Sequence, residues 1–306
     1  MRQRETDVTT TAQPYNLQSL VSPYAASPER DRSIGAILID SGRLTADDAE
    51  RILREQKEKG LRFGEAAVSL GLVKQEDIRY ALSRQFDYPY LMPGSGAVSN
   101  EVIAAYEPFG RQVEALRALR GQLMLRWFGS EPQRKALAII SPERGEGRSY
   151  LAANLAVVFS QLGERTLLVD ADLRHPRQHE LFGLPNRSGL SAILSGRAEG
   201  SAVERIPDFL DLSVLTAGAV PPNPLELLGR QTFGGLLEGL AGLFDVIIVD
   251  TPAAAVGADA QTIAVRTGAS LLIARKNHTQ LGELQDLAAD LAQVNAVVVG
   301  SVLNDH

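Results

Sequence analysis

The sequence of 306 residues contains no cysteine, which excludes disulfide bonds and thiolate-bound metal ions. No apolar run approaches the ~18 residues that a membrane-spanning helix needs, and the first thirty residues lack the apolar core of a signal peptide. A net charge of −6 argues against a basic surface for nucleic acid. We therefore expect a cytoplasmic protein that neither spans a membrane nor binds nucleic acid.

The composition otherwise fits a globular protein, with 44% apolar residues. The length favours two domains over one. Residues 1–30 are polar and rich in Ser, Thr and Pro, without a sustained period, which indicates a disordered tail. We expect four parts: the disordered tail (1–30), a small helical repeat domain (31–92), a linker with an amphipathic helix (93–132) and an α/β domain (133–306).

The segment after the tail repeats itself, because residues 33–56 align with residues 62–85 at a constant offset of 29 residues. Each copy predicts a short helix that ends at a glycine, followed by a second helix with its own cap. In the first copy Thr45 and Asp48 stand close to a capping box. Two such helical pairs can pack into a small domain. The matching positions are Gly35 and Gly64, Gly42 and Gly71, Asp48 and Asp77, Leu53 and Leu82, and Gln56 and Gln85.

Residues 111–128 carry an apolar stripe at helical spacing, which predicts an amphipathic helix. Beyond them the chain alternates continuous apolar runs with helical stretches. Such runs are typical of strands buried on both faces, and the alternation implies right-handed βαβ crossovers. We predict an α/β fold with a doubly wound, mostly parallel sheet. The predicted strands are 137–140, 166–169, 212–215, 246–249, 271–274 and 297–302.

A glycine-rich loop joins the first predicted strand to a helix. Gly145 and Gly147 allow backbone N–H groups to approach a triphosphate, and the helix N-terminus adds positive potential. Ser149 stands where the hydroxyl of such a loop binds Mg²⁺. Two positions depart from the GxxxxGK[ST] pattern: Pro142 replaces the first glycine, and Arg148 replaces the lysine. Taken alone, the loop is also compatible with a structural turn.

Three carboxylates follow predicted strands. Asp170 and Asp172 come at the end of the second strand, and Asp250 comes at the end of a later one. Doubly wound folds bind ligands at the carboxyl ends of their strands. A spacing of two residues directs Asp170 and Asp172 to the same side. One carboxylate alone fits a solvated turn, whereas the loop and the three carboxylates together predict a nucleotide site.

The segments GEGRS (145–149), LLVDADLR (167–174) and IIVDTP (247–252) resemble, in this order, the Walker A, Walker A′ and Walker B motifs of bacterial tyrosine kinases. These kinases are relatives of the ParA/MinD ATPases. The segments RHP, GLS, PNPLELL and VLN farther along fit the same pattern, and the resemblance spans roughly residues 33–306. Within the family, the chain looks most like the EpsG-type chain length determinant proteins of exopolysaccharide operons.

This resemblance implies a P-loop NTPase fold and a protein-tyrosine kinase, or an ATPase, that uses ATP and Mg²⁺. It implies a homo-oligomer that regulates exopolysaccharide chain length, polymerisation or export. A Wzz-like membrane chain-length determinant would be its partner and would recruit the cytoplasmic chain to the inner membrane. The residues implied to bind the nucleotide are Gly145, Glu146, Gly147, Arg148, Ser149 and Tyr150.

The resemblance also assigns roles to side chains. Asp170 would be the base for a tyrosine hydroxyl, with Asp172 and Arg148 as further catalytic residues. Ser149, Asp172 and Asp250 would hold the metal ion. A helix with the pattern E-x-x-R-x-x-R, which this family uses in subunit contacts, would be formed around Glu114, Arg117 and Arg120. At helical spacing these three charges equally fit a solvated face.

Two alternatives remain open. Arginine keeps the charge of the loop lysine but replaces a compact point donor by a planar fork, and no tyrosine cluster of the family's kind follows Asn304. A catalytically weak, nucleotide-gated scaffold is therefore the alternative to a kinase. The repeat resembles the N-terminal (MshEN-like) domain of type II secretion ATPases, some of which bind cyclic di-GMP. A helical docking module without a ligand is the alternative there.

Overall fold

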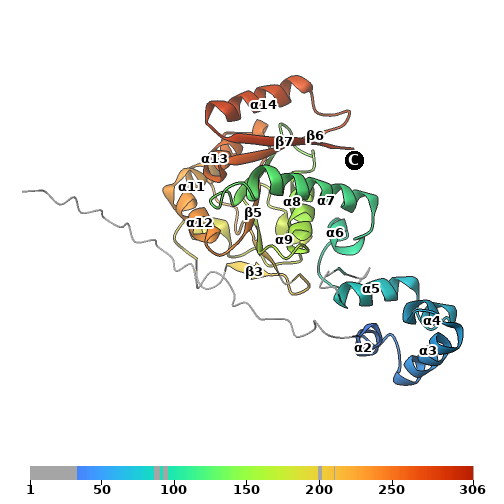
Figure 1. Cartoon of the computed structure of the whole chain (residues 1–306). Coiled ribbons are helices and arrows are strands. Elements are labelled where there is room, and N and C mark those ends of the chain that lie inside the picture. Colours follow the sequence, from blue (N-terminus) through green and yellow to red (C-terminus); the bar gives the residue numbers. More distant parts are fainter. Residues whose placement is uncertain (1–32, 86–89, 92–95, 199–201, 210, 306) are drawn as a thin grey trace, which may run out of the picture.

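The computed structural model describes residues 33–305, apart from 86–89, 92–95, 199–201 and 210. The tail predicted for residues 1–30 therefore lies outside the described residues. The remainder comprises an α/β body and, beside it in Figure 1, a group of four short helices that precedes it in the sequence.

A seven-stranded sheet forms the centre of the α/β body, in the order β3-β4-β2-β5-β1-β6-β7. Neighbouring strands run parallel, except that β3 is antiparallel to β4. Because β1 runs parallel to both β5 and β6, the loops after these three strands leave the same edge of the sheet. The predicted α/β fold with a mostly parallel sheet is confirmed. The strands are β1 (Ala136–Ile140), β2 (Thr166–Asp170), β3 (Val203–Arg205), β4 (Leu212–Leu215), β5 (Val246–Asp250), β6 (Ala269–Arg275) and β7 (Val297–Asn304).

Helices cover both faces of the sheet (Figure 1). One face packs against α6 (Ile103–Tyr106), α7 (Arg111–Leu123), α8 (Arg148–Ser160) and α9 (Gln178–Leu181). The other face packs against α10 (Leu190–Leu194), α11 (Pro224–Gly229), α12 (Gln231–Ala241), α13 (Asp259–Thr267) and α14 (Leu281–Gln293). A short 3-10 helix, η2 (Ala254–Val256), follows β5.

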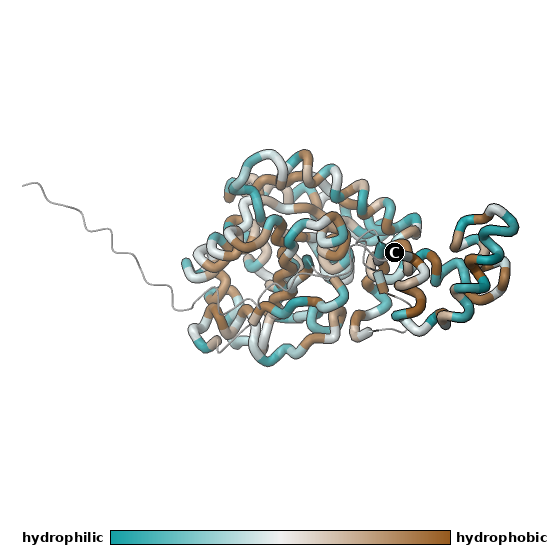
Figure 2. Tube along the Cα trace, turned by 60° about the horizontal axis from the view of Figure 1, so that its bottom comes forward, coloured by the Kyte–Doolittle hydropathy of each residue, from teal (hydrophilic) through white to brown (hydrophobic). Residues whose placement is uncertain are grey.

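Alternation along the strands divides the core into two layers. In β1, Leu137 and Ile139 belong to the cluster beneath α8, whereas Ala138 and Ile140 belong to the cluster on the opposite face. Successive side chains of a strand point to opposite faces, so a strand covered by helices on both sides must be apolar throughout. Figure 2 shows these hydrophobic strands inside the body. The apolar runs of β2, β4 and β5, buried throughout, and of β1 have this physical cause. The apolar run of β7 was also expected to be buried on both faces, but this edge strand is half-buried or exposed along its whole length.

Four helices form the repeat: α2 (Ile34–Asp40), α3 (Ala46–Lys59), α4 (Phe63–Ser69) and α5 (Gln75–Gln85). Their buried side chains form a third hydrophobic cluster that contains residues of this segment only. The predicted capping box at α3 is present, because Thr45 and Asp48 bond reciprocally. In the second copy Asp77 accepts a hydrogen bond from Lys74 N at 2.9 Å. The matching aspartates therefore cap equivalent helices.

The amphipathic helix predicted for residues 111–128 has an irregular end. The α-helix stops at Leu123, and a wider π-helical turn, η1 (Met124–Phe128), completes it. This turn brings the indole of Trp127 to β1, where its Nε1 donates to Ala136 O at 2.9 Å. Periodicity alone does not distinguish one wide turn from regular helix. Strand β3 was also missed, because three residues are too short to show a period.

We expect Gly64→Ala to destabilise the repeat. A Cβ atom at Gly64 would lie 2.8 Å from Cγ2 of Ile78, a branched side chain without room to withdraw. Overpacking of this kind costs about 1–3 kcal/mol, which a denaturant titration followed by circular dichroism will measure. The matched control is Gly121→Ala, since Gly121 is an exposed glycine in α7 and its added methyl group would have no neighbouring atom within 4 Å. A Gly64→Ala protein as stable as the control would contradict this packing.

Candidate active site

The loop between β1 and α8 forms the centre of the site. Gly145 has φ of 76° and Gly147 has φ of 100°, in the left-handed region that favours glycine. A Cβ atom at Gly147 would lie 2.4 Å from Nδ2 of Asn304. The backbone conformation therefore favours glycine at position 147, and any side chain there would also have to displace the amide of Asn304. Helix α8 begins directly after it, at Arg148.

Residues from the far end of the chain hold this loop. Glu146 is fully buried, accepts a hydrogen bond from Glu143 N at 2.8 Å, and also accepts one from the hydroxyl of Thr279. Asn304 Nδ2 donates to Glu146 O at 3.0 Å, and Arg275 donates to Gly145 O at 3.2 Å. The ends of β6 and β7 thus fix the backbone of a loop that follows β1.

The guanidinium of Arg148 is turned into the protein. Its Nε donates to Thr251 O at 2.9 Å, and its Nη1 donates to Glu143 O at 2.6 Å and to the hydroxyl of Ser141. Burial lowers the pKa of Arg148, which the neighbouring carboxylate of Asp250 opposes. Arginine stays protonated at neutral pH. Arg148 therefore ties the loop to the segment after β5 while it keeps its charge beside the carboxylates.

Asp170 and Asp172 occupy different environments. Asp170 is fully buried, and its carboxylate accepts three backbone hydrogen bonds: Oδ1 from Asp172 N at 3.2 Å, and Oδ2 from Arg177 N at 3.0 Å and Gln178 N at 2.9 Å. Burial and then the nearby Asp250 hold the pKa of Asp170 well above its usual value. Asp172 Oδ1 accepts from His175 N at 2.9 Å, and Asp172 lines the cavity beside the loop. The spacing of two residues predicted that both aspartates point to the same side of a strand. Strand β2 ends at Asp170, so the alternation of a strand does not extend to Asp172.

Asp250 is paired in register with Asp170 on the neighbouring strand. Its Oδ2 accepts a hydrogen bond from Nε2 of Gln178 at 2.8 Å, and the side chain of Ser149 lies near enough to this carboxylate to lower its pKa. Burial raises the pKa of Asp250 to about 6, although Ser149, Gln178 and Arg148 act in the opposite direction. The structure therefore brings Ser149, Asp172 and Asp250 together around the start of α8.

A cavity of about 250 Å³ opens between the glycine loop and Asp172. Basic groups surround its mouth, and Arg144 Nη2 lies 3.4 Å from Nδ1 of His175. Of the residues predicted to contact nucleotide, all but the buried Glu146 line this cavity. The lining residues are Arg144, Gly145, Gly147, Arg148, Ser149, Tyr150, Asp172, His175, Arg177, Pro252, Ala253 and Val256.

The residues present fit a magnesium ion. Asp250 Oδ1 is buried, and within the described part of the chain no donor reaches it. The three carboxylates at this edge are partly balanced by the buried guanidinium of Arg148. Across the described residues no group of three or more His, Asp or Glu side chains has the arrangement of a metal cage. Mg²⁺ bound with a nucleotide needs only one or two carboxylates, because phosphates and waters complete its shell.

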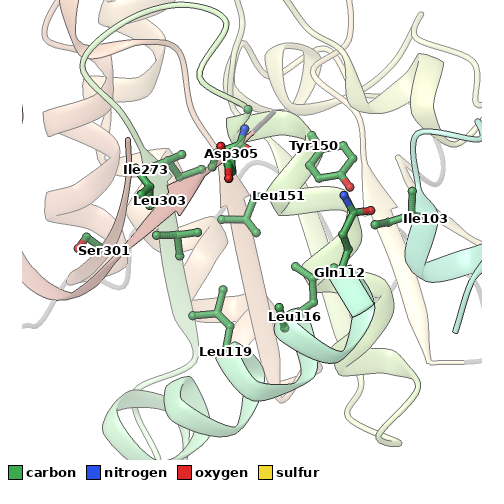
Figure 3. Close-up of a pocket in the computed structure, with 14 residues that line it drawn as sticks. Ile103, Gln112, Leu116, Leu119, Tyr150, Leu151, Ile273, Ser301, Leu303 and Asp305 are labelled. Carbon is green, nitrogen blue, oxygen red and sulfur yellow. The ribbon is translucent and has the colours of Figure 1, made fainter. Parts of the chain in front are cut away.

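A larger and mainly apolar cavity of about 440 Å³ adjoins the first (Figure 3). Both cavities are lined by Gly147 and Tyr150. Leu116 and Leu119 of α7 form one wall, and Leu303 and Asp305 at the end of β7 form another. The phenol ring of Tyr150 is half-buried, and burial raises its pKa. The two cavities therefore share part of their walls at the first turn of α8.

The three charges predicted for subunit contacts lie on α7. Glu114 and Arg117 form an ion pair, and Arg117 also donates to Pro108 O. Arg120 donates to Val158 O on α8 at 2.8 Å. Glu114 is mostly exposed, whereas Arg117 is mostly covered. Both arginines therefore already help to attach α7 to its surroundings within one chain.

Comparison with known proteins identifies the family. No family model matches the chain. The tyrosine-protein kinase YwqD of Bacillus subtilis is 34% identical over 207 residues, which cover 68% of this chain and 86% of YwqD. The chain belongs to the bacterial tyrosine-protein kinase family. CapB of Staphylococcus aureus is 36% identical over 193 residues, which cover 62% of this chain and 83% of CapB. The match to the longer kinase Etk of Escherichia coli covers 28% of that protein.

Solved structures agree with this family. The kinase domain of Escherichia coli Etk aligns with a TM-score of 0.63 and 34% identity, over 66% of this chain and 79% of that domain. The chimerical protein CapA2B2 aligns with a TM-score of 0.63 and 32% identity, over 76% of this chain and 98% of that one. The cell division ATPase MinD of Pyrococcus furiosus shares the fold. It aligns with a TM-score of 0.50 and 24% identity, over 56% of this chain and 72% of the MinD chain. The kinase-family P-loop NTPase fold expected from the motifs is confirmed.

Residues of the site that sequence reasoning missed lie outside the three motifs. Gln178 is four residues beyond the LLVDADLR segment. Arg275 at the end of β6, Thr279 in the turn after it and Asn304 at the end of β7 contact the loop. Polar side chains of these types are common in turns, so no pattern distinguishes them. Only Asn304, which ends the apolar run of β7, carried a visible signal.

We expect Gly147→Ala to weaken ADP binding by about tenfold or more, because a left-handed alanine costs roughly 1–2 kcal/mol before the contact with Asn304 is counted. Isothermal titration calorimetry of the full chain measures this effect. The matched control is Gly163→Ala, which has φ of 90° and no atom within 4 Å of the position that its methyl group would take. The control carries similar backbone strain in a remote turn. Equal ADP affinities in both variants would show that position 147 does not shape the site.

Proposed function

We propose that this chain is an ATP-binding, tyrosine-kinase-like protein that regulates the chain length, polymerisation or export of an exopolysaccharide. One observation carries the proposal. The glycine loop, the first turn of α8 and Asp172 line one cavity at the edge of the sheet, and Asp250 lies buried beside Ser149 next to it. Membership of the bacterial tyrosine-protein kinase family supports phosphoryl transfer from ATP as the reaction.

Each group has a role in this reaction. The backbone of Gly145 and Gly147 and the N-terminus of α8 would bind the phosphates. Ser149, Asp172 and Asp250 would hold Mg²⁺, which supplies neutralisation of phosphate charge when bound. Basic groups at the mouth, Arg144 and His175, would draw the anionic nucleotide inward. The chain's own contribution is thus positioning and charge compensation.

We assign the proton-accepting role to Asp172 and not to Asp170. Asp172 lines the cavity and accepts backbone hydrogen bonds through one oxygen, Oδ1, whereas both oxygens of the fully buried Asp170 accept backbone hydrogen bonds. A base must lie within reach of the proton that it removes. Asp170 instead fixes the turn after β2, which carries Asp172. This differs from the sequence-based assignment, in which Asp170 was the base.

Arg148 supports a second candidate function, a nucleotide-gated scaffold with weak catalysis. Three acceptors of the protein, Ser141 Oγ, Glu143 O and Thr251 O, already engage its guanidinium. A lysine is a single compact donor on a flexible stem, and at this position it would be less firmly tied to these acceptors. The arginine thus fixes the glycine loop firmly, but its charge is less free to move with the phosphoryl group during transfer. This supports a scaffold more than a fast kinase.

Phosphotyrosine mass spectrometry of the full chain with ATP and Mg²⁺ tests these alternatives. We expect phosphotyrosine in the wild type when the cytoplasmic segment of a Wzz-like membrane protein is present. Arg148→Lys should raise the rate by about tenfold, and Asp172→Asn should lower it by about 100-fold or more. Phosphotyrosine in Arg148→Lys alone would establish the scaffold instead. Absence of phosphotyrosine from both the wild type and Arg148→Lys would contradict the kinase proposal. An Asp170→Asn protein less active than Asp172→Asn would contradict the assignment of Asp172 as the base.

We further propose that the base of ATP lies in the apolar cavity beside Tyr150, which shares Gly147 and Tyr150 with the cavity at the glycine loop. Its walls are aliphatic, and Gln112, Asn304 and Asp305 supply polar groups for a purine edge. Small-molecule sites commonly combine apolar walls with a few polar groups.

Ala115→Trp should therefore weaken ATP binding by about tenfold, because Ala115 lines this cavity and an indole would fill it. Binding of inorganic tripolyphosphate, which has no base, should stay unchanged. Fluorescence competition measures both affinities. Ala118→Trp, at an exposed position of the same helix that does not line the cavity, is the matched control. Equal loss of ATP and tripolyphosphate binding would place the base elsewhere.

The partners follow from the family resemblance and are proposals. No helix among the described residues is both long and apolar enough to cross a membrane. A Wzz-like chain-length determinant would bring this EpsG-type chain to the inner membrane, and Glu114, Arg117 and Arg120 would contribute to a homo-oligomer. Sedimentation of wild type and Glu114→Ala with ATP tests the oligomer, since the side chain of Glu114 is largely exposed.

We propose that helices α2–α5 form a separable regulatory module of the MshEN-like type. Docking without a ligand is favoured, because Gly35 and Gly64 are explained by packing. A Cβ atom would lie 3.1 Å from Phe63 at the first position and 2.8 Å from Ile78 at the second. A titration of the full chain with cyclic di-GMP decides between docking and ligand sensing.

A further inference from the structure

A buried glutamine outside the three motifs connects all of them. Gln178 begins α9 and has no exposed surface. Its Nε2 donates to Asp250 Oδ2 at 2.8 Å and to Ser149 O at 3.1 Å, and its backbone N donates to Asp170 Oδ2 at 2.9 Å. One residue thus contacts the first turn of α8 and the terminal carboxylates of both β2 and β5.

Its orientation is fixed by chemistry. The amide nitrogen faces two acceptors, Ser149 O and the Asp250 carboxylate. Rotating the amide by half a turn would place Oε1 against those acceptors and lose both hydrogen bonds. The orientation that the structure shows therefore leaves Oε1 as the group still to be satisfied.

Two buried oxygens in this pair lack donors. For Gln178 Oε1 and for Asp250 Oδ1, no described residue supplies a hydrogen bond. Burial of an unsatisfied acceptor costs free energy comparable to a lost hydrogen bond. The two side chains are already joined through their other polar atoms, so each presents one acceptor in the same buried region. Groups of this kind are satisfied by ordered water or by water bound to a metal ion.

We propose that Gln178 is the positioning residue for Asp250. Nε2 of Gln178 holds Oδ2 of Asp250, so that Oδ1 of Asp250 would be placed to accept a hydrogen bond from a water bound to Mg²⁺. Oε1 of Gln178 would accept from a water in the same region. Because Gln178 also donates to Ser149 O, it links the carboxylate of Asp250 to the first turn of α8, directly after the glycine loop. The inference rests on the proposed nucleotide function, and it concerns only how strongly Mg²⁺ and nucleotide binding are coupled.

The test is ADP affinity of the full chain with and without Mg²⁺, measured by calorimetry for wild type and Gln178→Met. Methionine keeps the length of the side chain and loses the amide. We expect the gain in ADP affinity that Mg²⁺ provides to fall by about tenfold, as for other residues that orient metal ligands, while ADP affinity without Mg²⁺ changes less than about threefold. The half-saturating Mg²⁺ concentration should rise accordingly.

Gln161→Met is the matched control. Gln161 is also a buried glutamine, its Nε2 donates to Ala104 O at 3.1 Å, and it lies at the opposite end of α8 from the loop. An unchanged Mg²⁺ effect in Gln178→Met, or an equal change in Gln161→Met, would overturn the proposal. If Gln178→Met unfolds, Gln178→Glu replaces it in the same measurement, and an unaltered Mg²⁺ effect there has the same meaning. Failure of the wild type to bind ADP at all would instead refute the proposed function.

Discussion

Two aspartates on neighbouring strands impose the main constraint on this site. Asp170 and Asp250 end β2 and β5 side by side, both fully buried, and burial raises the pKa of each. Charges in such a place persist only when donors or cations compensate them. Three backbone N–H groups surround Asp170, whereas Asp250 relies on Ser149, Gln178 and the nearby Arg148. Two segments help to compensate these two carboxylates. The turn after β2 donates to Asp170, and the start of α8 brings Ser149 and Arg148 close to Asp250.

The same constraint explains why distant segments meet. The strand order places β1 between β5 and β6, so the loop after β1 has Asp250 on one side and the β6–β7 edge on the other. Thr279 and Asn304 hold Glu146, and Arg148 reaches across to Thr251. The loop is thereby fixed from both neighbours before any nucleotide arrives. A binding loop with this many partners loses little conformational entropy on binding.

Much of the fold could be predicted from the sequence, because burial on both faces makes the central strands continuously apolar, although β7 is an apolar edge strand without that burial. Six strand positions and the four repeat helices follow from such patterns. The order of strands in the sheet does not, since it depends on packing between segments far apart. Within the site, glycines and carboxylates carried a readable pattern. Gln178 and Thr279 carried no such pattern, because single polar residues of these types are common in turns. Their roles became visible only from their contacts in the folded chain.

The glycines show why residue type alone does not determine a role. Gly64 makes room for Ile78, and Gly147 combines a left-handed backbone with close approach of Asn304. A methyl group at Gly64 would meet Ile78 and one at Gly147 would meet the amide of Asn304, yet the first glycine lies at a contact between helices and the second lines the cavity of the site. Arg148 follows the same logic, since its charge would suit a phosphate but its donors serve Ser141, Glu143 and Thr251. Its effect on turnover therefore depends on how firmly those three acceptors retain it when the cavity fills.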